Sequence, residues 1–455
     1  MECISITELY LMALFEFLSW RREDAFPRAG NRFGRYTDAW KSPEQQAHWA
    51  QALDAWQQGH TLDCVTALLA YLYDAQQKNV WWTCHDGYIE FGLLQGSKVV
   101  HGRADERCIR AECKVAHTTA LPLDLLQRLT EMNYSLHFSK YALDDARDIV
   151  MVTFSHALDA SPYKLYYGLR ELATHADKQD DLLLEEFPSL SPVEMTHILP
   201  LSEEECSQRY RFFHQQLQQL FHELDSELLL SKPDAAAVSC WLLGLIYKLD
   251  YLVKPEGYTM ELFERLHRNF FANDGRSVYD KNGELYHQLQ RLFERSREDF
   301  FRELYLVPAT FGITEVAPHD RLCNLIDSEL PRLEWYIEHR HMPFALAIAD
   351  YIVGYSLFNY ALPPPDLALL HLYYCVRHYS YFEALGMEHG LVDRDTGRLR
   401  ESAIRRAILA VAKKYVEIYP RFKPSVQMLD CTNQQTFAQS FLQMIRHLDL
   451  TQKDV

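Results

Sequence analysis

The segment HLYYCVRH, in the C-terminal half of the chain, combines residue types that bind transition metals. His371, Cys375 and His378 are separated by four and three positions, so a helix would present two imidazoles and a thiol on one face. Zinc accepts these ligands, but a structural zinc site needs a fourth, and nothing in the sequence supplies it. We therefore expect no metal and interpret the segment as a tightly packed aromatic helix.

Two shorter motifs contain histidine. In EHRHMP, His339 and His341 stand two positions apart at an expected helix end, so their side chains do not converge. Histidine near a helix C-terminus interacts favourably with the helix dipole, which explains the pair without catalysis. In WWTCHDG, Cys84 and His85 are adjacent in a strand or turn, where neighbouring side chains point apart. We expect no catalytic residue in either motif.

An acidic stripe follows the C-terminal part of an expected helix. Asp177, Asp181 and Glu185 recur every four residues, so they share one helix face. Like charges at this spacing cost a few tenths of a kcal/mol each, so the stripe does not serve helix stability. It is either a solvated face or a surface that meets a basic partner or another part of the chain.

Sequence signatures of the common enzyme classes are missing. The chain contains no P-loop, dinucleotide-binding, zinc-protease or nucleophile-elbow motif, and its 17 glycines leave few candidates for a phosphate-binding loop. We expect no cofactor. A net charge of −17 opposes binding to nucleic acid or to an anionic membrane, because both need clustered lysine and arginine.

The cysteines and the N-terminus predict a cytoplasmic protein. The ten cysteines are scattered without a CxxC pair, as expected for buried free thiols in a reducing compartment. The apolar N-terminal segment carries Glu2, Glu8 and Glu16 and lacks a basic region, so it matches neither a signal peptide nor a membrane span.

Periodicity predicts an α+β protein with a large helical part. Apolar residues first recur at helical spacing, and the period changes to two from Asn79. Strands at 134–143 and 148–156 should pair antiparallel around the turn at Asp144–Asp145. Ser161 and Pro162 should then begin a long helix.

Four segments follow from this pattern. We expect an N-terminal helical segment at 1–60, an α+β domain with a small antiparallel sheet at 61–187, a proline-containing linker at 188–201 and an all-α domain at 202–455. One helix of the last domain should span 282–306. Within the last segment, 247–268 echoes 355–377, since both have an aromatic helix end, a proline break and an amphipathic helix. The echo reflects either two stacked helical units or chance similarity between Tyr- and Leu-rich helices.

The segment LHFSKYALDDARDIVMVTFSHALDASPYKLYYGLRELATHADKQDDLL contains a strand, an acidic turn, a second strand and a helix with an acidic end. In this order the chain resembles the YbjN and type III secretion chaperone-like family over about residues 61–187. The resemblance implies a small α+β fold. Secretion chaperones of this fold are dimers around which their substrates wrap.

The expected function is therefore a non-enzymatic, protein-binding adaptor or chaperone-like protein of bacterial type. The resemblance also implies a homodimer. Aromatic side chains supply interface area at low entropic cost, which suits such a role. The expected partner-binding residues are Phe138, Met151, Asp177, Asp181 and Glu185.

An alternative class stays open. The chain could be a helical hydrolase or a metal-dependent enzyme with a site between its two halves, using residues such as His339, His341 or His371. Convergence of acids and histidines from distant segments would favour this class, whereas an apolar groove alone would favour binding.

Overall fold

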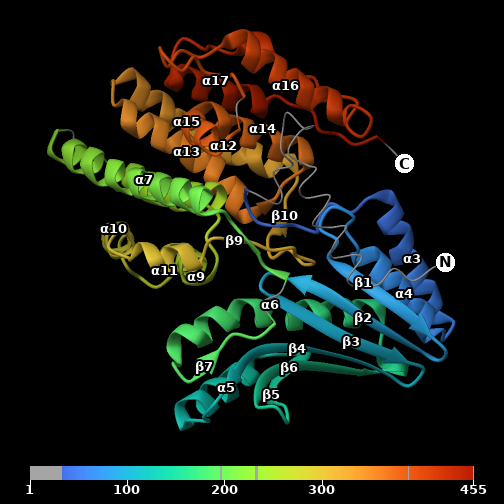
Figure 1. The fold of residues 1–455 in the computed structure, drawn as a ribbon. Helices are drawn as coiled ribbons and strands as arrows, with labels where there is room; N and C mark the ends of the chain where they lie inside the picture. The colour runs from blue at the N-terminus through green and yellow to red at the C-terminus, as the bar shows by residue number, and fades with distance from the viewer. Residues whose placement is uncertain (1–32, 195–196, 231–233, 388, 454–455) are drawn as a thin grey trace. The chain divides into compact units, whose positions relative to one another are not determined.

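The computed structural model describes residues 33–194, 197–230, 234–387 and 389–453 and shows the expected α+β class (Figure 1). The chain forms two compact units. Unit 1 contains Lys41–Ile198 and Val307–Phe311, and unit 2 contains Leu199–Leu306 with the described residues of Arg32–Trp40 and Gly312–Val455. The first part of the expected N-terminal helical segment, residues 1–32, lies outside the described residues.

Unit 1 is built from helices around an antiparallel sheet. Its elements are α3 (Pro43–Gln57), α4 (Thr61–Leu72), β1 (Val80–His85), β2 (Tyr88–Gln95), β3 (Lys98–Asp105), β4 (Cys108–Thr118), α5 (Leu123–Ser135), β5 (Ser139–Leu143), β6 (Asp148–His156), α6 (Pro162–Glu186) and β7 (Leu190–Ser191). Helix α3 packs on α4, so this unit begins before residue 61, where the α+β domain was expected to start.

The sheet has the strand order β1-β2-β3-β4-β6-β5, and β7 pairs with β4. The predicted antiparallel hairpin is confirmed, with β5 and β6 in register from Ser139 opposite Thr153 to Leu143 opposite Ile149. Its first strand is shorter than expected, because α5 continues to Ser135. Asp144 closes the turn by accepting a hydrogen bond from the backbone NH of Asp148.

Helix α6 covers one face of the sheet. It begins as predicted, with the Ser161 hydroxyl accepting from the NH of Lys164 and with Pro162 in the first turn. Its buried side chains include Leu165, Leu169 and Leu172, which pack on the apolar rows of the strands. The opposite face of the sheet carries charged residues such as Glu90, Arg103 and Arg110, which are exposed.

Unit 2 is mostly helical. Its elements are β8 (Leu199–Pro200), α7 (Glu203–Leu230), α8 (Ala235–Leu252), α9 (Gly257–Phe271), α10 (Val278–Phe293), α11 (Arg297–Arg302), β9 (Tyr305–Leu306), β10 (Glu315–Val316), α12 (His319–Glu338), α13 (Met342–Asn359), β11 (Tyr360–Ala361), α14 (Pro364–Arg377), α15 (Tyr379–Ala384), α16 (Glu401–Tyr415) and α17 (Gln434–Arg446).

The expectation that everything after residue 202 is helical is wrong in detail. Strands β8 and β9 form a two-residue antiparallel ladder, and β10 and β11 form a two-residue parallel ladder. One helix was expected at 282–306, but α10 ends at Phe293 because Ser296 caps a new helix, α11.

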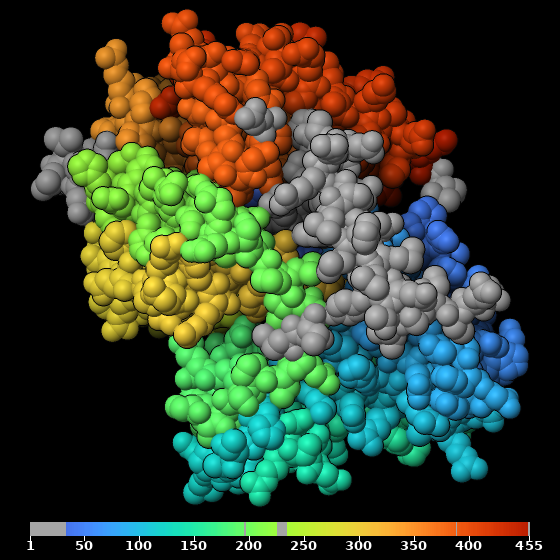
Figure 2. Space-filling model, viewed as in Figure 1, coloured from blue at the N-terminus to red at the C-terminus, as the bar shows by residue number. Residues whose placement is uncertain are grey.

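Helices α8 and α13 form the centre of unit 2, and their C-terminal ends are the first parts of the two echoed segments. Gly354 lets them approach closely, since a β-carbon on this residue would lie 2.9 Å from the Tyr247 Cβ atom. Helix α8 is long and apolar enough to cross a membrane, but 78% of it is buried, as in a core helix. Figure 2 shows the surfaces of α7 and of α9–α11 meeting, in agreement with the packing of the Phe221 ring against Phe293.

Candidate functional site

Of the three residues considered as metal ligands, His371 and Cys375 are core residues, whereas His378 is partly exposed. The Tyr251 hydroxyl lies 3.0 Å from His371 Nδ1, and the Cys375 side chain is fully buried. Burial lowers the pKa of His371 to about 3, which indicates a neutral ring. Within the described part of the chain, no three His, Cys, Asp or Glu side chains come together as metal ligands.

The histidines near residue 340 and the Cys84 motif also occupy ordinary positions. His339 stacks on Trp335, with ring centroids 3.9 Å apart, and His341 precedes α13 as its N-cap. The His85 ring stacks on Tyr88 at the end of β1, at 4.5 Å between centroids, while Cys84 is exposed.

Part of the acidic stripe makes contacts within unit 1. Asp177 accepts a 2.7 Å hydrogen bond from the backbone NH of Ser97, at the turn between β2 and β3. Asp181 is half-buried, and only Glu185 is exposed. Asp180, which lies beside the stripe, is buried and is 2.8 Å from the Lys98 ammonium. The stripe is therefore not one continuous partner-binding surface.

The two apolar residues expected to bind a partner differ sharply. Met151 faces α6 and is fully buried in the core of unit 1, so the expectation that it contacts a partner is wrong. Phe138 is 41% exposed at the start of β5. The Glu171 carboxylate accepts the NH groups of residues 137–139, at 2.8 to 2.9 Å, and so holds the start of this strand.

A cavity of about 270 Å³ in unit 2 brings together charged residues that the sequence analysis did not single out. Its lining comes from α7, α8, α13, α14 and the start of α17. The apolar wall includes Trp241, Leu245, Leu346 and Ala347, and the polar part includes Gln219, Glu223 and Gln435. The volume lies near the lower end of the range for small-molecule sites, which begins at roughly 300 Å³.

Two cations, Lys248 and Arg377, and two carboxylates, Asp350 and Glu223, form the charged part of this cavity. Lys248 Nζ lies 3.3 Å from Asp350 Oδ2, and Arg377 Nε lies 3.4 Å from Asp350 Oδ1. The Tyr373 hydroxyl donates to the same Asp350 oxygen at 2.8 Å. Among the described residues, Asp350 is the only carboxylate within ion-pair distance of either cation. Two buried cations therefore share one anion.

The pKa values follow from this arrangement. Burial lowers the pKa of Lys248, and the nearby Arg377 lowers it further against the opposing effect of Asp350. Burial would raise the pKa of Asp350, but Arg377 and Lys248 outweigh burial and hold that pKa well below its usual range. Asp350 is thus ionised, while an added anion would favour the charged form of Lys248.

His378 supplies an unsatisfied polar atom in the same cavity. Its side chain is 10% exposed, and Nε2 has no hydrogen-bond partner among the described residues. Burial lowers its pKa well below the ordinary value, and Lys248 adds to this effect. Because a buried polar atom without a partner costs about 1–3 kcal/mol, a ligand or a water that reaches Nε2 would be stabilised there.

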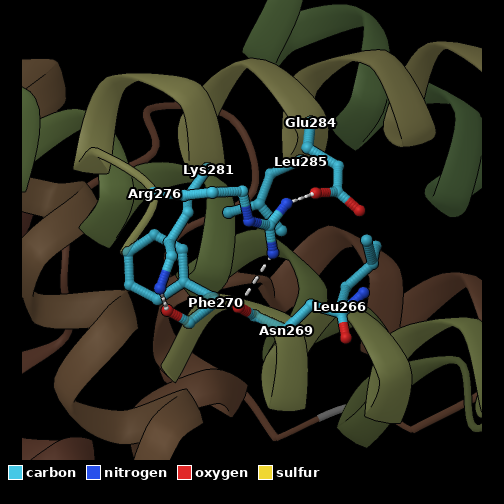
Figure 3. A pocket seen from close by; sticks show the side chains of 7 residues that line it. All are labelled: Leu266, Asn269, Phe270, Arg276, Lys281, Glu284 and Leu285. Atoms are coloured by element: carbon cyan, nitrogen blue, oxygen red, sulfur yellow. Dashed lines mark hydrogen bonds and ion pairs between the residues drawn. The ribbon is translucent and has the colours of Figure 1, made fainter. Parts of the chain in front are cut away.

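A second, much smaller cavity is filled by its own side chains. It measures about 10 Å³ and lies between α9 and α10 (Figure 3). Arg276 bonds to Glu284 and to the carbonyl of Asn269, while Lys281 donates to the carbonyl of Phe270 at 2.9 Å. These cations satisfy carbonyls at the C-terminal end of α9, so this place has no room for a ligand.

Charged residues within apolar helices were the available sequence signal for the larger cavity. Lys248 stands in WLLGLIYKLDYL and Asp350 in FALAIADYIVGY, where an unpaired charge would be costly. Nothing local indicates that the two pair, since they are 102 residues apart. No protein-family model matches the sequence, and no curated protein matches it either.

Proposed function

We propose that this chain is a binding protein whose helical unit takes up a small organic anion in the cavity beside Lys248 and Arg377. The observation that carries the proposal is that these two buried cations share the single carboxylate of Asp350 at the wall of an open volume. Buried charges are costly unless they are paired, so a second anion would complete the set.

The lining suggests the kind of anion. Trp241, Leu245 and Leu346 offer apolar contact beside the charged group, so the ligand should carry an apolar portion. Arginine binds carboxylates in a planar, bidentate geometry, which favours a carboxylate head. Glu223 on α7 adds a negative charge to the lining and disfavours ligands with two negative charges. A small monocarboxylate meets all three conditions.

Calorimetric titration of the full chain with hexanoate and with hexanamide tests this proposal. The two probes share an alkyl chain and differ in charge, so hexanoate should bind at least tenfold more tightly. Arg377→Met should remove most of this difference. Arg302→Met is the matched control, because Arg302 is 79% exposed and outside the lining, and it should bind as the wild type does. Equal binding of both probes, or binding of neither, would overturn the proposal.

Binding rather than turnover agrees with the leading expectation from the sequence, although a protein partner for unit 1 stays a prediction. The resemblance to the YbjN and type III secretion chaperone-like family likewise stays a prediction. The proposed cavity is lined by residues of unit 2 alone.

A further inference from the structure

A second cluster in unit 2 joins a thiol, an imidazole and a carboxylate. Cys323 Sγ lies 3.2 Å from His319 Nε2, and both oxygens of Asp366 lie 2.9 Å from His319 Nδ1. The order is that of a nucleophile, a base and a group that orients the base. None of these residues lines the anion cavity, so the cluster is independent of the function proposed above.

Short strands place the three residues together. The β10–β11 ladder is parallel, and Ala317 NH continues it by donating to the Ala361 carbonyl at 3.2 Å. Helices α12 and α14 begin just after these strands, so their first turns are brought together. His319 opens α12, and Cys323 lies four residues later on the same face. Asp366 lies in the first turn of α14, where a negative charge is stabilised by the helix dipole.

Burial differs along the cluster in the way that a reactive thiol needs. Asp366 is fully buried, His319 is 8% exposed, and Cys323 is partly exposed at the surface end. The buried Asp366 therefore orients the imidazole, and Cys323 is the member of the cluster that a reagent in solution can reach. Cys323 also contacts the carbonyl of Arg446, at 3.6 Å, at the end of α17.

The electrostatics keep a proton on the imidazole. Burial would lower the pKa of His319, but hydrogen bonds to Asp366 and to Cys323 raise it to about 10. Charged or titratable groups near the cluster include Asp320 and Arg321, which follow His319 in α12, Tyr419, which interacts with Asp366, and Arg446, whose guanidinium pairs with Asp327. A protonated imidazole beside a sulfur favours the thiolate, which is the nucleophilic form of cysteine.

We propose that Cys323, held by His319 and Asp366, is an activated nucleophile that accepts acyl groups from activated esters or thioesters. In this step Cys323 Sγ attacks the carbonyl carbon and forms a new thioester, as the bond from that carbon to the leaving oxygen or sulfur breaks. The proton on His319 Nε2 passes to the leaving group. Asp366 acts through His319 as a positioning residue, because it does not touch the reacting atoms.

The first experiment measures nucleophilicity in the wild-type chain. Iodoacetamide is added at pH 6, and the alkylation rate of each cysteine is followed by peptide mass spectrometry. Cys84 is the internal reference, since it is exposed and has no hydrogen bond to a histidine among the described residues. Cys323 should react at least tenfold faster than Cys84. Reaction at or below the Cys84 rate would overturn the proposal without any variant.

The pH profile and two variants separate activation from a structural role. The advantage of Cys323 over Cys84 should shrink as the pH is raised through about 10, because His319 then loses the proton that activates the sulfur. Asp366→Asn and His319→Gln should each lower the Cys323 rate at least tenfold and leave the Cys84 rate unchanged. An unchanged circular dichroism spectrum shows that a variant is folded, and an unchanged Cys84 rate shows that the reagent is equally active in each sample. If folded Asp366→Asn keeps the wild-type rate, the role of Asp366 is refuted.

Acyl acceptance is tested with p-nitrophenyl acetate on the full chain. Wild-type protein should release at least one equivalent of p-nitrophenolate and carry acetyl on Cys323, or go on releasing p-nitrophenolate if water removes the acetyl group. Cys323→Ser should lose both signals. Fast alkylation by iodoacetamide without release of p-nitrophenolate above the Cys323→Ser background would overturn the acyl chemistry.

Discussion

Each unit of the molecule buries a lysine against an aspartate, and the two pairs differ in what surrounds them. In unit 1, Lys98 and Asp180 lie 2.8 Å apart with side chains 0% and 1% exposed. Lys98 also donates to the Val115 carbonyl at 3.1 Å, and the Ser97 hydroxyl donates to Asp180. Each of these two charges has a partner, and neither of the two cavities in unit 2 is lined by Lys98 or Asp180.

In unit 2, Lys248 and Asp350 lie farther apart, at 3.3 Å, and Arg377 competes for the same carboxylate. This group borders open volume and leaves His378 Nε2 without a partner. The difference shows that a buried ion pair by itself indicates only a structural role. A shared carboxylate beside open volume is what points to a ligand.

The largest effect should come from breaking the closed pair. Lys98→Met leaves Asp180 buried without its cation, which should lower the free energy of unfolding by about 3–5 kcal/mol. Urea unfolding followed by circular dichroism measures the loss. The double variant Lys98→Met with Asp180→Leu removes both charges and should recover most of it. No recovery would show that packing, and not charge, stabilises this place.

A somewhat smaller loss should follow from Gly96→Ala, beside the closed pair. Gly96 has a φ of +55°, and a β-carbon there would collide with the Asp177 carboxylate. Backbone strain and the lost hydrogen bond to Ser97 should together cost about 2–4 kcal/mol in urea unfolding. Gly87→Ala is the control, since φ is +83° but no atom lies within 4 Å, so only the strain of about 1 kcal/mol remains. Equal losses would argue against the Asp177 contact.

Breaking the open pair should cost less stability but should affect binding. In Lys248→Met, Arg377 and Tyr373 still satisfy Asp350, so the free energy of unfolding should fall by only about 1 kcal/mol. Hexanoate affinity, measured by calorimetry, should fall at least tenfold. A stability loss as large as that of Lys98→Met, with unchanged hexanoate affinity, would show that the Lys248–Asp350 pair is also purely structural.

The pH dependence of hexanoate binding should show the same contrast. Burial lowers the pKa of Lys248, and an anion binds its ammonium form. Affinity should therefore be highest below this pKa, fall as pH rises through it, and level off at the value of Lys248→Met. In the absence of ligand, the unfolded chain binds more protons between the lowered pKa and the ordinary one near 10.4, so stability relative to Lys248→Met should rise with pH in that window. A pH-independent affinity would contradict the role of Lys248.

The smallest effect should come from the exposed end of the acidic stripe. Glu185→Gln removes a charge that shares a face with Asp181, so unfolding should change by less than about 0.5 kcal/mol. Asp177→Asn is the comparison within the stripe, because it weakens the bond to Ser97, and should cost about 1–2 kcal/mol by the same urea assay. A larger loss for Glu185→Gln would mean that this residue has a structural contact.

The sequence by itself determined the local elements. Period-two alternation located β5 and β6, and Ser161 with Pro162 marked the start of α6, because strand pleat, helix period and capping depend on residues close together in the chain. Local signals also misjudged boundaries, such as the Ser296 cap that separates α10 from α11.

Tertiary structure alone decided which of these residues act together. Lys248 meets Asp350 across 102 positions, and His319 meets Asp366 across 47. The local sequence shows only a charged residue within an apolar helix, or a cysteine four residues after a histidine. Tertiary packing determines the partner, because burying a charge is less costly when the fold brings an opposite charge near it. The local sequence pattern does not indicate which opposite charge that is.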